Sequence, residues 1–73
     1  MALRPLPARK VLKALSIPGF KPIRQKRSHI LLEHADGRFT VVPNHPREEI
    51  DRGLLRKIIK EIEMEPGEFM KLV

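Results

Sequence analysis

The sequence contains no cysteine, tryptophan or tyrosine, and its three aromatic residues are all phenylalanine. Without cysteine the chain has neither a disulfide framework nor a thiolate metal site, so its fold must rest on an apolar core. No apolar run approaches the roughly 20 residues that cross a bilayer, and the amino-terminal residues lack the pattern of a secretory signal. We therefore expect one domain over residues 1–73, located in the cytoplasm, with no membrane partner.

Acidic residues are missing from the first 32 positions, which hold eight lysines or arginines. The remaining positions carry seven basic and nine acidic residues, so the two parts have charges of +8 and −2 within a net charge of +6. A field this uneven predicts an anionic partner for the amino-terminal part. Nucleic acid is the favoured anion, because no long basic amphipathic helix with aromatic residues suggests a membrane surface.

Hydrophobic periodicity predicts an α+β domain. Apolar residues recur at i, i+3, i+4 and i+7 in two segments, which is typical of helices, and alternate with polar residues between them, which is typical of strands. The expected elements are a tail over 1–6, a helix over 7–15, strands over 20–26, 28–34 and 39–42, a loop over 43–46, a helix capped by Asp51 and stopped by Pro66, and a short helix over 66–72. This order favours a fold of the double-stranded-RNA-binding type, with helices covering one face of a three-stranded antiparallel sheet. We expect Phe20, Phe39 and Phe69 in the core.

The segment Gln25-Lys26-Arg27-Ser28-His29 leads a histidine into the strand over 28–34. Alternation places Ile30 and Leu32 on the core face and turns His29 and Leu31 to the other face. From position alone, His29 is either an ordinary solvated strand residue or an acid/base group among phosphate-binding cations. Leu31 either marks where a partner or a second copy docks, or is one exposed leucine of the kind that most proteins have.

Further polar residues are candidates for contact with RNA, since cationic side chains bind backbone phosphates. These candidates are Lys21, Arg24, Lys26, Arg27 and Ser28, and, on the second helix, Arg52, Arg56 and Lys60. The helical row is equally consistent with a solvated helix face. All three aromatics are assigned to the core, so we expect recognition by shape and charge rather than by base stacking.

The two other histidines have weaker claims to chemistry. His45 is either a second proton carrier or a loop residue that fixes the turn through a backbone hydrogen bond, and His34 lies next to a hairpin. Three histidines without a helical i, i+4 pair or any cysteine do not make a metal site. We predict no metal and no cofactor.

The chain resembles the HicA family of small toxins, also called YcfA-like, over about residues 8–72. The motifs that carry the resemblance are Pro18-Gly19-Phe20, Arg24-Gln25-Lys26 leading to Ser28-His29, Asp36-Gly37-Arg38, Val42-Pro43-Asn44-His45, and the segment 49–58 that opens the second helix. The resemblance implies a double-stranded-RNA-binding-like fold, metal-independent cleavage of messenger RNA, and inhibition by an antitoxin of the HicB type. It places the family's catalytic histidine at His29.

Two positions depart from the family pattern. Arg27 stands where the family usually has glycine, so it restricts the backbone while adding a phosphate-binding guanidinium. Leu54 replaces a threonine near the start of the second helix. The hypothesis that follows from the resemblance is a toxin ribonuclease, and the alternative is a non-catalytic RNA-binding module of the same fold.

Overall fold

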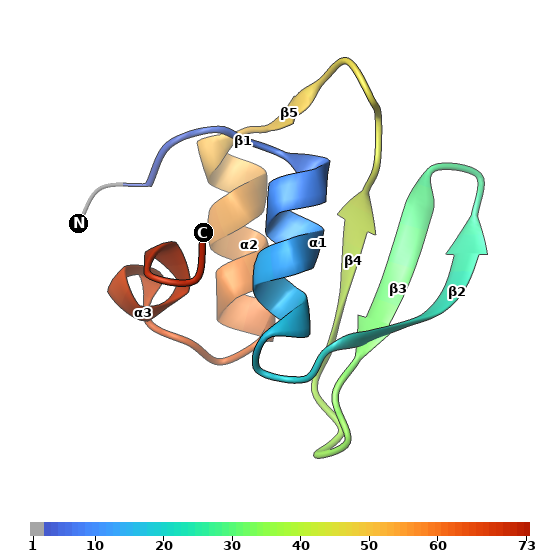
Figure 1. The fold of residues 1–73 in the computed structure, drawn as a ribbon, viewed down its shortest axis with the longest axis vertical. Helices are drawn as coiled ribbons and strands as arrows, with labels where there is room; N and C mark the ends of the chain where they lie inside the picture. The colour runs from blue at the N-terminus through green and yellow to red at the C-terminus, as the bar shows by residue number, and fades with distance from the viewer. Residues whose placement is uncertain (1–2) are drawn as a thin grey trace.

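The computed structural model describes residues 3–73 and contains helices and short strands in one α+β arrangement (Figure 1). The elements are β1 (Leu6–Pro7), α1 (Ala8–Ser16), β2 (Lys21–Lys26), β3 (His29–Glu33), β4 (Phe39–Pro43), β5 (Glu49–Ile50), α2 (Arg52–Glu61) and α3 (Pro66–Met70). Strands β2, β3 and β4 form an antiparallel sheet in that order. The helix, three strands, helix order confirms the predicted fold class.

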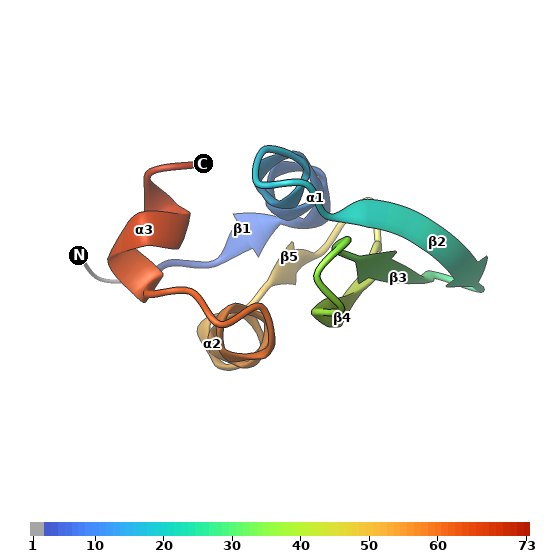
Figure 2. The same ribbon diagram turned by 90° about the horizontal axis from the view of Figure 1, so that it is seen from below.

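The helices α1 and α2 lie on the same side of the sheet, as the view from below shows (Figure 2). Ile30 and Leu32 of β3 point toward them and are buried, whereas His29 and Glu33 are exposed and Leu31 is half-buried. No described element lies over the opposite side, which we call the open face. The predicted alternation along β3 is therefore confirmed.

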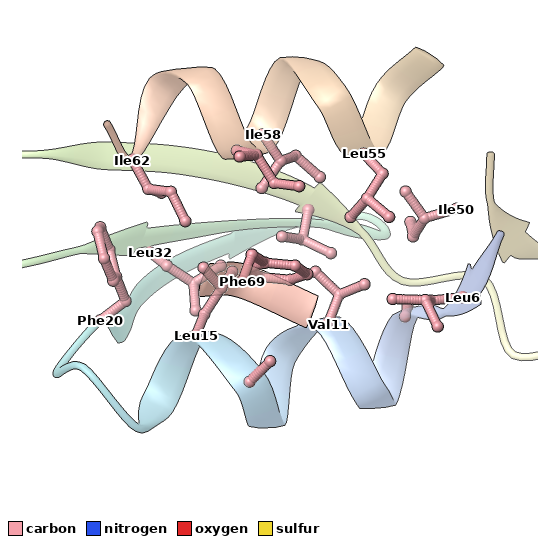
Figure 3. Close-up of a cluster of buried hydrophobic side chains, with 14 of the residues drawn as sticks. Leu6, Val11, Leu15, Phe20, Leu32, Ile50, Leu55, Ile58, Ile62 and Phe69 are labelled. Atoms are coloured by element: carbon pink, nitrogen blue, oxygen red, sulfur yellow. The ribbon is translucent and has the colours of Figure 1, made fainter. Parts of the chain in front are cut away.

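The helices cover the other face of the sheet, which we call the closed face. The core lies between the helices and this closed face (Figure 3). Each element contributes apolar side chains at the spacing its backbone dictates: period two from the strands, and three or four residues from the helices. The fully buried large side chains include Val11, Leu15, Phe20, Leu32, Val42, Leu55, Ile58, Ile62 and Phe69. The core positions predicted for Phe20 and Phe69 are confirmed.

The core position predicted for Phe39 is wrong, because its side chain is 59% exposed. In β4 the residues that point inward are Thr40 and Val42, so strand alternation turns Phe39 and Val41 to the open face. The Thr40 hydroxyl is buried and donates a hydrogen bond of 2.8 Å to Glu61 Oε1. This bond satisfies the one polar side chain that the described core contains.

The prediction of a tail over 1–6 is wrong at its end, since Leu6 is 2% exposed and pairs with Ile50 in the small β1–β5 ladder. Met1 and Ala2, the other end of that tail, lie outside the described residues. Two-residue strands have no periodicity to detect, which is why the sequence did not indicate this ladder. The ladder ties the start of α1 to the start of α2.

Different residues determine where α2 begins and where it ends. Asp51 is the predicted N-cap, and its Oδ1 accepts a hydrogen bond of 2.8 Å from the amide of Leu54. The helix ends at Glu61, before the predicted stop at Pro66, and Glu63 adopts a left-handed backbone with φ of 55°. Pro66 instead begins α3.

His34, directly after β3, joins the β3–β4 hairpin to the loop before β2. Its Nε2 donates to the Pro18 carbonyl at 2.9 Å, and its Nδ1 accepts from the amide of Asp36 at 3.1 Å. Its ring packs edge-on against Phe20, with centroids 5.1 Å apart. Both ring nitrogens thus hold backbone groups, which makes His34 a structural residue.

Arg38 fastens the same hairpin to α2. Its guanidinium pairs with the Asp36 carboxylate at 2.9 Å, donates to the Ile62 carbonyl at the end of α2, and lies over the ring of Phe20. Hydrogen bonds from Arg38 hold the pKa of Asp36 below its ordinary value. The Asp36-Gly37-Arg38 motif therefore has a structural role in this chain.

Candidate functional site

His29 is the first residue of β3, and its side chain is exposed on the open face. Its neighbours across the sheet are Lys26 on β2 and Pro43 on β4. An open hollow of about 170 Å³ beside it is lined by Arg24, Lys26, His29, Leu31 and Val41. The hollow thus brings an imidazole and two cations together beside apolar side chains, an arrangement that suits a phosphate and its sugar.

Arg27 occupies the turn that presents His29. Lys26 and His29 are paired, so Arg27 and Ser28 are the two turn residues between β2 and β3. Arg27 has φ of 56°, in the left-handed region that favours glycine, and its carbonyl accepts a hydrogen bond of 2.9 Å from Gln25 Nε2. The backbone here has the conformation for which glycine is suited, although the residue is arginine.

Ser28 and His45 meet at the same end of the sheet. Ser28 Oγ lies 3.3 Å from His45 Nε2, and the amide of Asn44 donates to the Ser28 carbonyl at 2.7 Å. His45 lines hollows on the side of the 44–50 loop and does not line the hollow of His29. The side chain of His45 is thus a partner of Ser28, whereas one of its two predicted roles was a contact with the backbone.

The remaining candidates are exposed but dispersed. Lys21 pairs with Glu33 at the end of β2 that lies away from His29. Arg52, Arg56 and Lys60 lie on α2, which packs on the closed side of the sheet (Figure 2). The structure brings Arg24 and Lys26 to the hollow of His29 and leaves Lys21 and the row on α2 outside it.

Val41 is a residue of the site that the sequence analysis missed. It lines the hollow of His29, and Leu31, beside it on β3, is its partner across the ladder. The signal was present, because a strand whose Val42 points inward must turn Val41 outward. Within residues 3–73 no cluster of three or more metal-ligating side chains occurs, and none of the described helices has the length and apolarity to cross a membrane.

The fold and this site define an α+β domain of the double-stranded-RNA-binding type with an exposed histidine in a cationic hollow on its open sheet face. The sequence pattern of the HicA toxins of bacterial toxin-antitoxin systems matches residues 8–64, which include His29 and all three strands of the sheet. The chain therefore belongs to the HicA toxin family. A search of curated proteins gave no match.

Proposed function

We propose that this toxin is a metal-independent endoribonuclease that cleaves messenger RNA in the cytoplasm, with His29 as its acid/base group and an antitoxin of the HicB type as its inhibitor. The observation that carries the proposal is the position of His29, exposed beside Arg24 and Lys26 in a chain of the HicA toxin family. Histidine exchanges protons near neutrality, and the cations attract the phosphodiester.

The proposed reaction is a transesterification within the RNA. His29 removes the proton of a 2′-hydroxyl, the 2′ oxygen forms a bond to phosphorus, and the bond from phosphorus to the 5′ oxygen breaks. Arg24 and Lys26 stabilise the charge that builds on the phosphate oxygens. The hollow is open, so water supplies the proton that the leaving 5′ oxygen takes up.

The other candidate residues fit a role in binding RNA outside the reacting phosphate. Ser28 and Arg27 lie one and two residues before His29, while Lys21 and the row Arg52, Arg56 and Lys60 are exposed farther from it. We expect alanine at Lys21 or at the α2 row to weaken binding with a reduced salt dependence. Cleavage of RNA that is already bound is expected to change little.

The test compares wild type, His29→Ala and His45→Ala on RNA in the presence of EDTA. We expect His29→Ala to lower the cleavage rate by about 10²–10⁴-fold, the usual contribution of a general acid or base. His45→Ala is the matched control, and retention of most activity is expected because His45 does not line the hollow. Equal cleavage by wild type and His29→Ala, or loss of wild-type cleavage in EDTA, would contradict the proposal.

One observation favours the second candidate, an RNA-binding module without catalysis. Within residues 3–73 no hydrogen bond orients the imidazole of His29, whereas an acid/base group is commonly held by a neighbour. This candidate predicts salt-sensitive RNA binding without strand scission. It also predicts that Arg24→Ala and Lys26→Ala lose binding while His29→Ala keeps it.

A further inference from the structure

Strand β4 is an edge strand, and the phase of its hydrogen bonds shows which of its backbone groups are free. The amide of His34 donates to the Arg38 carbonyl, and the amide of Asn44 donates to the Ser28 carbonyl, in one unbroken register between β3 and β4. Bonded pairs alternate along an antiparallel ladder, so the even-numbered residues of β4 bond to β3. The odd-numbered residues turn their N–H and C=O groups away from the sheet.

Phe39 and Val41 therefore present two donors and two acceptors along the outer edge of β4. No described strand pairs with this edge. The opposite edge differs, because β2 contains Pro22 and a register shift that leaves Ile23 unpaired. Proline and bulges prevent an edge from accepting another strand, and the centre of β4 carries neither.

A hollow beside the free edge of β4 can accept a side chain of a bound segment. A hollow of about 100 Å³ lies between β4 and α2, lined by Phe39, Thr40, Val41, Leu54, Lys57, Ile58 and Glu61. Phe39 and Val41 are 59% and 41% exposed, the two large apolar side chains of β4 that the core leaves out. An exposed strand edge with an adjacent apolar hollow is the arrangement by which domains bind an extended peptide as an added strand.

We propose that an extended segment of the antitoxin pairs with the outer edge of β4 and places an apolar side chain in the hollow between β4 and α2. The inference deepens the proposed function, since it names the surface on which the inhibitor docks. A family defined by toxin-antitoxin systems supplies the partner. A second copy of this chain is a poorer occupant, because two chains of net charge +6 repel each other.

The position of Val41 connects this docking to inhibition. Val41 lines both the hollow beside α2 and the hollow of His29. A strand added at β4 lies next to the His29 hollow and hinders the approach of RNA. Glu61 already accepts the Thr40 hydroxyl, whereas Lys57 has no described ion-pair partner, so the docking segment is expected to carry an acidic residue near Lys57.

Amide hydrogen exchange tests the pairing directly. The toxin carries His29→Ala, so that binding is measured without any cleavage, and the probe is a purified antitoxin protein of the HicB type. We expect the amides of Phe39 and Val41 to exchange at least about tenfold more slowly in the complex, because they become hydrogen-bonded. The amide of Gln25, on the outer edge of β2, is the internal control and should not change. Unchanged exchange at Phe39 and Val41 in a formed complex would overturn the proposal.

Variants supply the second measurement, again in the His29→Ala background. Phe39→Pro removes an outward N–H and the ring, Phe39→Ala removes the ring alone, and Gln25→Pro removes an outward N–H from the opposite edge. We expect Phe39→Pro to weaken antitoxin binding by about tenfold or more, Phe39→Ala by less, and Gln25→Pro by less than about twofold. Circular dichroism confirms that each variant is folded.

The binding results test the proposed docking site separately from the ribonuclease proposal. Equal binding by Phe39→Pro and the parent, equal losses at both edges, or no complex with the parent protein would each contradict the docking site. If instead an RNA oligonucleotide protects the amides of Phe39 and Val41 and the antitoxin does not, the edge is not the inhibitor's site. Cleavage by the wild-type chain is measured independently, so its absence would leave the binding results standing.

Discussion

The two ends of strand β3 are built in opposite ways. At the Glu33 end, the side chains of His34, Asp36 and Arg38 bond to backbone or to one another and tie the hairpin to the loop before β2 and to α2. At the His29 end, the described side-chain bonds of the turn are those of Gln25 and Ser28, and the surrounding cations are exposed. Side-chain bonds thus hold the Glu33 end, whereas the ionisable groups at the His29 end are exposed to solvent.

The largest change in stability is expected from Gly19→Ala, which strains the anchored end of β3. Gly19 has φ of 112°, and an added Cβ would lie 3.3 Å from His34 Nε2. We expect a loss of about 1–3 kcal/mol in the free energy of unfolding, measured by urea denaturation. Gly37→Ala is the matched control, because Gly37 has φ of 98° but no atom within 4 Å of the added Cβ. Equal losses would mean that the contact with His34 is unimportant.

A smaller effect is expected from Asp36→Asn, and it should depend on pH. The side-chain and backbone hydrogen bonds with Arg38 lower the pKa of Asp36 from its ordinary 3.8. The folded carboxylate binds its proton less readily than the unfolded one, so its contribution is complete above the ordinary pKa and is lost as pH falls through the lowered value.

The measurement is the Tm of wild type and Asp36→Asn at neutral pH and at a pH below the lowered pKa. Wild type should melt higher at neutral pH, and the two should converge in acid. A difference that stays constant across this range would show that the ion pair does not anchor the hairpin.

The smallest effect on stability is expected at the open end, from Arg27→Gly. Relief of the left-handed strain favours the variant by about 1–2 kcal/mol, and the greater freedom of unfolded glycine offsets about 0.5–1 kcal/mol of that. Arg27→Ala keeps the strain and should gain little. If the guanidinium contacts phosphate, both variants should bind RNA more weakly than wild type, and by the same factor. A clear loss of stability in Arg27→Gly would mean that the arginine side chain holds the turn.

Much of the fold was predictable because the hydrophobic periodicity of the sequence follows the period of its helices and strands. The helical stripes of 8–15 and 54–62 and the alternation at Ile30 and Leu32 specify which faces are buried. Phe39 was placed wrongly because its hydrophobicity was given more weight than its phase relative to Val42. The β1–β5 ladder was missed because pairing between residues this distant leaves no local pattern.

The sequence also predicted part of the candidate site. Alternation placed His29 on the open face, and family resemblance suggested the acid/base role that we propose for it. The sequence did not reveal that α2 carries Arg52, Arg56 and Lys60 on the other side of the sheet, since periodicity gives the faces of a helix without its place around the sheet. Nor did composition indicate that Arg27 adopts a left-handed backbone, which is a property of the turn geometry.

The β1–β5 ladder has a consequence for motion. The segment 44–50 is held at one end by the Asn44 amide on the Ser28 carbonyl and at the other by Ile50 on Leu6. A segment fixed at both ends moves freely only if one tie opens, and releasing Ile50 also exposes Leu6 from the core. Large excursions of the segment therefore belong with local unfolding rather than with fast loop motion. His45 travels with this segment, so its contact with Ser28 lasts as long as both ties hold.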